Sequence, residues 1–257
     1  MLKYSIPLIP NGIMWWLVSA LNRPIMEANL GMHAIGLFAV ANKFPAILTM
    51  IFAVFSTSWQ ISVIEEYEKD GYSHFFNNVF RIVILLMILA SCLISILSPL
   101  IISIFANENY YESWRYVPVL LLSSVLIGIS GMAGSNFSAT KESKYFFYSS
   151  VWGALTAVIG NILFIPYIGT MGACLSVVFS FLVMSLSRCF YCWKYVKIHH
   201  ISKIIFSLVG NIIIILLTLS SLYTSFKIVG YCLSFIFILY VNGDVLRQVY
   251  NVIKSRI

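Results

Sequence analysis

Long apolar stretches alternate with short polar segments along almost the whole chain. We predict that they form eight membrane-spanning helices, at Tyr4–Pro24, Ala34–Ser62, Asn78–Phe105, Val117–Phe137, Tyr145–Ile165, Thr170–Tyr191, Lys203–Leu222 and Ile228–Val241. A helix needs about 20 residues to cross the hydrocarbon core of a bilayer. The last stretch is shorter than that, so its flanks between Tyr223 and Arg247 would have to complete the span. The runs lack the alternation typical of barrel strands, so the predicted fold is all-α, a polytopic membrane helical bundle.

Composition supports a membrane protein. Hydrophobic residues make up 60% of the chain and charged residues 10%, against about 45–50% and about 25% in soluble domains. The mean hydropathy is +0.93 over the chain. A sizeable soluble domain between the spans is therefore not expected, and the function is expected to lie in the helices and short loops.

The positive charges are distributed unevenly between the two sides of the predicted bundle. Twelve of the 16 lysines and arginines fall on the side of the N-terminus, namely Lys3, Lys69, Arg81, Lys141, Lys144, Arg188, Lys194, Lys197, Lys203, Arg247, Lys254 and Arg256. The other four are Arg23, Lys43, Arg115 and Lys227. The positive-inside rule then places both termini in the cytoplasm. A basic rim that contacts anionic lipid headgroups accounts for most of the net charge of +7 without nucleic acid as a partner.

Small and polar residues recur at helical spacing within several predicted spans. The second span carries a polar stripe, Asn42, Ala46, Thr49, Ala53, Ser56 and Gln60. The first carries Gly12, Trp16, Ser19 and Arg23, the fourth Gly128, Gly131 and Gly134, and the fifth Gly153, Ala157 and Asn161. The glycine sets favour close helix packing, whereas each polar stripe faces either protein or a wet cavity.

Two cations, Arg23 and Lys43, are the candidate binding residues. If a straight helix begins at Ala34, Lys43 lies about 13–14 Å into a hydrocarbon layer of about 30 Å. The alternative is that this long segment projects into water and brings Lys43 toward the headgroups. Arg23 lies near the end of its span, where it contacts an anion, a headgroup or Glu27. Arginine binds phosphate through two hydrogen bonds, and lysine acts as a point charge.

The stretch IPLIPNGIMWWLVSALNRPIMEANLGMHAIGLFAVANKFP resembles the start of the C-terminal half of a polysaccharide flippase, the Wzx type of O-antigen transporter, in the superfamily that includes the MATE exporters. Trp59 with the Glu65-Glu66-Tyr67-Glu68 run, and the segment from Pro166 to Ala173, also resemble this family. The resemblance covers essentially the whole chain.

The resemblance implies a transporter of two helical lobes around a central cavity. Such a transporter flips undecaprenyl-pyrophosphate-linked oligosaccharide across the bacterial inner membrane by alternating access. Its substrate-binding residues here would be Arg23, Lys43, Trp16, Asn42 and Asn22. The family often has Asp-Arg where this chain has Asn22-Arg23, so a local acid is missing while the cation is kept. Trp16 would stack on sugars, although packing or lipid contact is the simpler interpretation.

Family members carry about twelve to fourteen helices, so this chain resembles half of a transporter. Residues 1–200 would be a C-terminal lobe of six membrane helices, and residues 201–257 an additional helix pair with a basic cytoplasmic tail. The expected partners are membrane lipids, a lipid-linked oligosaccharide, an N-terminal transporter lobe and polysaccharide assembly proteins.

Enzymatic activity is not expected, because the acidic residues lie in loops apart from Asp244 near the edge of the last span. No cofactor and no metal are expected either. Cys189 and Cys192 with His199 and His200 resemble a zinc motif only superficially, since adjacent histidines rarely bind one metal. The alternatives left open are a multidrug-type exporter lobe, a scaffold for polysaccharide assembly proteins, and a membrane acyltransferase or polymerase.

Overall fold

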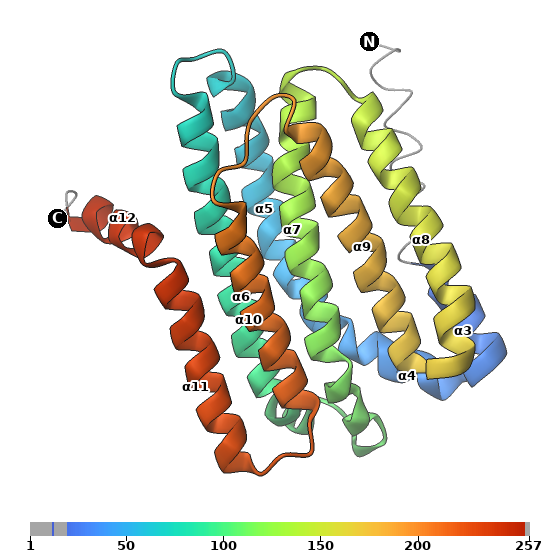
Figure 1. The fold of residues 1–257 in the computed structure, drawn as a ribbon. Helices are drawn as coiled ribbons and strands as arrows, with labels where there is room; N and C mark the ends of the chain where they lie inside the picture. The colour runs from blue at the N-terminus through green and yellow to red at the C-terminus, as the bar shows by residue number, and fades with distance from the viewer. Residues whose placement is uncertain (1–11, 13–19, 255–257) are drawn as a thin grey trace.

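The computed structural model describes residue 12 and residues 20–254, without the side chains of residues 248–253. The helices are α3 (Asn22–Leu30), α4 (Met32–Ala41), α5 (Lys43–Glu66), α6 (Tyr72–Phe105), η1 (Glu108–Arg115), α7 (Val117–Ala139), α8 (Lys144–Ile168), α9 (Thr170–Cys192), α10 (Ile201–Leu219), α11 (Thr224–Val241) and α12 (Gly243–Lys254) (Figure 1). The chain is an all-α polytopic membrane bundle, as the sequence predicts.

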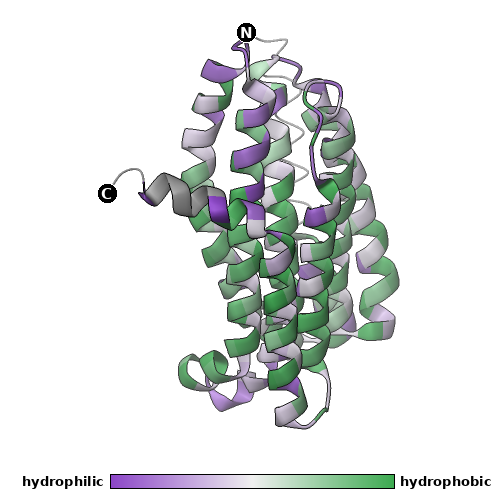
Figure 2. Cartoon of the chain, turned by 60° about the vertical axis from the view of Figure 1, so that its left-hand side comes forward, coloured by the Kyte–Doolittle hydropathy of each residue, from purple (hydrophilic) through white to green (hydrophobic). Residues whose placement is uncertain are grey.

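Seven of the described helical segments are long and apolar enough to cross a membrane. They correspond to the second to eighth predicted stretches, and each prediction is close to the observed bounds. Most of the first predicted stretch, Tyr4–Pro24, lies outside the described residues. Figure 2 shows hydrophobic residues concentrated in the middle of the bundle and hydrophilic ones toward its two ends. This banding is what a membrane-spanning bundle requires.

Helix α7 lies at the centre of the bundle and is buried along nearly its whole length. It packs against α5, α6 and α9, while α8 pairs with α9, α10 packs against α6, and α11 packs on α10. The loops that follow α5, α7 and α9 lie at one end of the bundle (Figure 1). This alternation agrees with the charge count, in which successive loops are assigned to opposite sides of the bundle.

The predicted close approach at the glycines of α7 is confirmed. A Cβ atom at Gly128, Gly131 or Gly134 would overlap a side chain of α6, α5 or α8, respectively. In the α8–α9 seam, Ser180 Oγ donates to the Gly153 carbonyl at 2.6 Å, and Ser176 Oγ donates to the Ala157 carbonyl at 3.1 Å. Small residues therefore let the helices approach closely enough for hydrogen bonds between them.

The second predicted span is not one straight helix. Pro45 has no N–H and cannot donate to the carbonyl of Ala41, so the helix is interrupted at Asn42. Figure 1 shows α4 running obliquely to α5 beneath α8 and α9. Helix α5 alone has 24 residues, which is about 36 Å at about 1.5 Å per residue. The depth estimated for Lys43 assumes a straight helix from Ala34, which the structure does not have, since Lys43 is the first residue of α5.

Two arginines counted with the basic side, Arg81 and Arg188, are buried residues of helices. Arg81 in α6 is 6% exposed and Arg188 in α9 is 3% exposed. Arg188 Nε donates to Ser149 Oγ at 3.1 Å, and its guanidinium lies 5.1 Å from the ring centre of Phe146. Arg188 thereby joins α8 to α9. Without these two arginines, ten cations remain on that side against four on the other.

Candidate functional site

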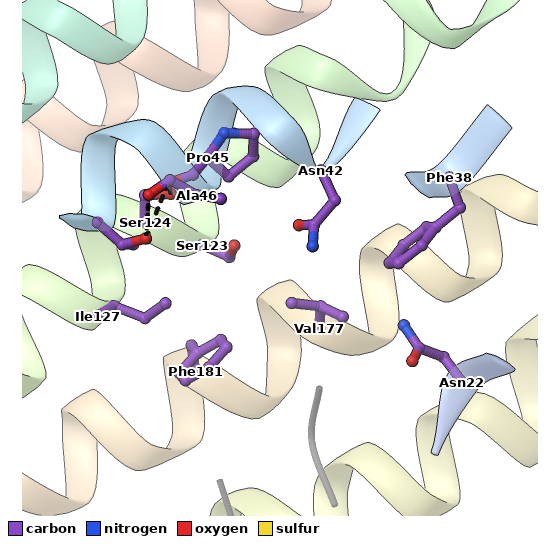
Figure 3. A pocket seen from close by; sticks show the side chains of 11 residues that line it. Asn22, Phe38, Asn42, Pro45, Ala46, Ser123, Ser124, Ile127, Val177 and Phe181 are labelled. Atoms are coloured by element: carbon purple, nitrogen blue, oxygen red, sulfur yellow. Dashed lines mark hydrogen bonds between the residues drawn. The ribbon is translucent and has the colours of Figure 1, made fainter. Parts of the chain in front are cut away.

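A cavity of about 200 Å³ lies among α3, α4, α5, α7 and α9 (Figure 3). Its lining residues are Asn22, Phe38, Asn42, Pro45, Ala46, Thr49, Ser123, Ser124, Ile127, Val177 and Phe181. We call it the polar pocket, because two amides and three hydroxyls lie on its wall within an otherwise apolar bundle. Such a concave site with a few convergent polar groups is the usual form of a binding site.

Asn22 has the most unusual environment in the polar pocket. Its side chain is fully buried, and neither its amide oxygen nor its amide nitrogen has a hydrogen-bond partner among the described residues. Figure 3 shows its amide directed into the pocket from α3, with Asn42 directed inward from the junction of α4 and α5. An unsatisfied buried polar group costs about 1–3 kcal/mol. The Asn22 amide is thus placed to accept from and donate to a polar ligand.

The hydroxyl groups of the pocket are held by the backbone. Ser124 Oγ donates to the Pro45 carbonyl at 3.2 Å, and Ser123 Oγ donates to the Leu120 carbonyl at 2.6 Å. Thr49 Oγ1 lies 3.0 Å from the same Pro45 carbonyl. Each hydroxyl uses its hydrogen on a carbonyl and keeps acceptor capacity on its oxygen. The Ser124 bond also fixes α7 against α5 at the edge of the pocket.

The polar stripe of α5 continues beyond the pocket into an open groove of about 590 Å³. Ala46 and Thr49 line both spaces, and Ala53, Ser56 and Gln60 line the groove alone. Gly131 of α7 forms part of the opposite wall. Of the two interpretations of the stripe, packing or a cavity, the structure favours the cavity.

The structure brings together only part of the predicted site. Asn22 and Asn42 line the polar pocket, whereas Arg23 and Lys43, one residue further along, are exposed and line neither the pocket nor the groove. Adjacent helix residues point about 100° apart, which explains the separation. Trp16 lies outside the described residues. The binding roles of all five residues stay predictions.

The Arg23–Glu27 pair that the sequence allows is not among the ion pairs of the described residues. Pro24 lies in the first turn of α3, where proline is tolerated.

Sequence reasoning did not find Ser123, Ser124 or Phe181. Serines are frequent in α7, so their spacing alone does not mark those that meet Pro45. Phe181 resembles any apolar residue of a membrane span. As for metals, no group of three or more histidine, cysteine or carboxylate side chains comes together in the part of the chain that the structure describes.

A further groove of about 490 Å³ runs between α7, α9 and α10. All of its lining residues are apolar: Val119, Leu122, Leu126, Met171, Leu175, Val178, Phe179, Leu182, Leu208, Ile212, Ile215, Leu216 and Leu219. This surface suits acyl or isoprenoid chains rather than polar ligands.

Two solved structures share this fold. The lipid II flippase MurJ in an inward-closed conformation superposes with a TM-score of 0.65 and 17% identity, over 90% of this chain and 52% of the flippase. An outward-facing multidrug resistance transporter of the MATE family, in the MOP superfamily, gives a TM-score of 0.60 and 18% identity, over 97% of this chain and 66% of that transporter. The chain therefore spans about half the length of the flippase. At these identities the likeness shows the fold.

No protein-family model matches the chain. No curated protein matches it either.

Proposed function

We propose that this chain is one lobe of a membrane transporter that flips undecaprenyl-pyrophosphate-linked oligosaccharide, such as an O-antigen unit or another surface polysaccharide unit. The observation that carries the proposal is the continuous polar hollow along α5, formed by the polar pocket and the adjoining groove. A membrane bundle has no structural need for such a hollow, because polar groups are costly away from water unless they are satisfied. The fold shared with a lipid II flippase and a MATE transporter supports the same function.

The chemistry of the hollow suits a sugar. Asn22 and Asn42 offer amide donors and acceptors, and Thr49 and the pocket serines offer hydroxyl oxygens. These are neutral groups that match the hydroxyls of an oligosaccharide. The exposed Arg23 and Lys43 follow directly after the two asparagines in the chain. In this proposal they receive the pyrophosphate next to the sugar, arginine with two hydrogen bonds and lysine as a point charge.

The proposal includes a second lobe. The exposed groove on α5 would form one wall of a central cavity, and an N-terminal lobe would supply the other. Residues 1–200 would form the lobe proper, residues 201–257 an additional helix pair, and the transporter would work in the bacterial inner membrane with both termini cytoplasmic. Its further partners would be membrane lipids and polysaccharide assembly proteins.

The second candidate function is a lobe of a multidrug-type exporter, which the fold shared with a MATE transporter favours. The residues that line the polar pocket and the α5 groove include no carboxylate among those described. A cation-extruding exporter needs acidic groups for its substrate or its coupling ion. The missing carboxylates therefore disfavour the exporter relative to the flippase.

A complementation experiment tests the flippase proposal. Arg23→Gln and Lys43→Gln are each expected to reduce surface polysaccharide about tenfold in a flippase-deficient strain supplied with both lobes, because each change removes a charge-assisted bond to phosphate. The measurement is the amount of polysaccharide at the cell surface, normalised to the amount of membrane-inserted chain. Arg115→Gln is the matched control, since Arg115 is an exposed cation of η1 outside both hollows.

Unchanged polysaccharide at normal expression in both variants would contradict the roles of Arg23 and Lys43 and favour a scaffold. Equal losses in Arg115→Gln would show that only the general positive charge matters.

A further inference from the structure

A separate pocket of about 490 Å³ lies where α6 begins and α12 leaves the bundle. Its lining residues are Gly71, Ser73, His74, Asn77, Asn78, Arg81, His199, His200 and Asp244. None of them lines the polar pocket or the α5 groove. We call it the basic pocket, because one arginine and three histidines lie on its wall with a single carboxylate.

Arg81 is the central side chain of the basic pocket. Its side chain is only 5% exposed, and Arg81 Nη2 lies 2.7 Å from Asp244 Oδ2. Arg81 Nε is buried and has no hydrogen-bond partner among the described residues. Lys203 Nζ lies 3.0 Å from the other oxygen of the same carboxylate. Two cations thus share one anion, which leaves a net positive charge and an unused guanidinium donor beside the cavity.

The Asp244 carboxylate is ionised at neutral pH. Its burial opposes ionisation, but hydrogen bonds from Lys203 and Arg81 outweigh that effect and lower the pKa of Asp244 to about 2. The group lies in the first turn of α12, outside the membrane-spanning helices. Any other anion that enters the pocket must therefore compete with the Asp244 carboxylate.

Helix starts add to the positive potential of the basic pocket. Helix α6 begins after Gly71 and the 19-residue α10 begins after His200, both of which have left-handed backbone conformations. Neither start is capped by a side-chain hydrogen bond. The amino end of a helix carries about half a positive charge, which attracts anions. The N–H groups of Tyr72, His74 and Lys203 already donate to the carbonyls of Lys69, Gly71 and His200. Gly71 and His200 themselves line the pocket, so both helix starts border it.

The wall of the basic pocket is held in place by Asn77. The Asn77 amide oxygen accepts from the backbone N–H of His199 at 2.6 Å, and its amide nitrogen donates to the Lys197 carbonyl at 3.0 Å. These bonds attach the segment between α9 and α10 to α6. The histidines at the end of that segment are thereby positioned before any ligand arrives.

From the orientation of α12 we expect the basic pocket to lie at the level of the lipid headgroups. Figure 1 shows α12 turning sideways from the end of α11, roughly across the direction of the spans. Val245 of α12 is buried, whereas Arg247 is exposed. A short amphipathic helix in this orientation lies in the membrane interface. Basic pockets between membrane helices at this level recognise the phosphate of anionic lipids.

We propose that the basic pocket binds the phosphate group of an anionic membrane phospholipid, with Arg81 and the starts of α6 and α10 as the binding groups and Asp244 as the competing anion. This site is independent of the proposed transport function, and its test does not use transport.

The test is a lipid titration of the purified full chain in a neutral detergent, followed by native mass spectrometry. Phosphatidylglycerol is the probe. Phosphatidylethanolamine, whose ammonium group offsets the phosphate, and inorganic phosphate are the comparison ligands. Arg81→Gln is expected to weaken phosphatidylglycerol binding about tenfold, because it removes a charge-assisted bond to phosphate. Arg247→Gln, an exposed cation of α12 outside the pocket, is the matched control and is expected to bind like the unchanged chain.

Asp244→Asn separates the proposal from a merely structural ion pair. Removal of the competing carboxylate is expected to tighten phosphatidylglycerol binding several-fold, although the ion pairs are lost. If the single variant Arg81→Gln does not fold, the double variant Arg81→Gln with Asp244→Asn removes both charges of the ion pair. This double variant must also lose phosphatidylglycerol binding while it elutes as a monodisperse species.

Three results would overturn the proposal. One is equal weakening by Arg81→Gln and Arg247→Gln. Another is unchanged or weaker binding in Asp244→Asn. The third is equal binding of inorganic phosphate and phosphatidylglycerol, which would assign the pocket to a soluble anion instead of a lipid.

Discussion

Replacing Gly172 with alanine is expected to lower the unfolding temperature of the detergent-purified chain by about 10 °C. A Cβ atom at Gly172 would lie 2.5 Å from the carbonyl carbon of Phe164 and 3.0 Å from the backbone nitrogen of Ile165. These are backbone atoms of α8, so no side-chain rotation relieves the overlap, and the α8–α9 hairpin must open. Overpacking of this kind costs about 1–3 kcal/mol. The upper end of this free-energy range corresponds to a fall in the unfolding temperature of about 10 °C.

Gly230→Ala is the matched control for this prediction. Its new Cβ would meet the end of the Leu217 side chain at 2.6 Å, and that side chain can rotate away. The measurement is thermal unfolding followed by the loss of the monodisperse peak in size-exclusion chromatography. If the two alanine variants unfold at the same temperature, the close approach at Gly172 does not limit stability.

Replacing Asn22 with leucine is expected to abolish most polysaccharide export while the chain becomes slightly more stable. Leucine has the same branched shape and the same number of side-chain heavy atoms as asparagine, and it removes two buried polar atoms that have no partner among the described residues. The gain in the free energy of unfolding is expected to be about 1 kcal/mol, because the desolvation cost of the amide disappears. The proposed contact of the Asn22 amide with the sugar is also lost, so export is expected to fall.

Asn22→Leu is expected to lower export and to raise stability, and this combination distinguishes a binding role from a structural one. A purely structural role for Asn22 predicts unchanged export with the same or greater stability. Asn29→Leu is the matched control on the same helix, since Asn29 is exposed and its amide already donates to the Ile25 carbonyl at 2.8 Å. Export in that control should match the unchanged chain, with surface polysaccharide and thermal unfolding measured on all three proteins.

The membrane helices were predictable because a span is a local property of the sequence. Each crossing requires its own run of apolar residues, and the ends of α7, α8 and α9 follow the ends of those runs within a few residues. The interruption at Asn42 was not predicted. Pro45 was visible in the sequence, but a proline in a membrane span bends the helix or is accommodated according to its neighbours.

The candidate site was predictable only in part. The stripe of α5 identified one wall, since helical periodicity shows which residues share a face. The opposite wall, with Ser124 of α7 and Phe181 of α9, depends on how helices pack, which periodicity does not determine. Arg188 is a second example of a contact that depends on how helices pack. The sequence predicts it near the end of a span, but not its hydrogen bonds to two serines of α8 within the bundle.

The missing N–H of Pro45 gives the polar pocket a mechanical property. Within a regular helix, bending strains backbone hydrogen bonds, but at the α4–α5 junction the bond that would resist bending is absent from the start. Asn42 and Pro45 stand at this joint, while Asn22 approaches from α3, which packs on α4. A small change of the α4–α5 angle would therefore change the separation of the two asparagine amides and with it the width of the polar pocket.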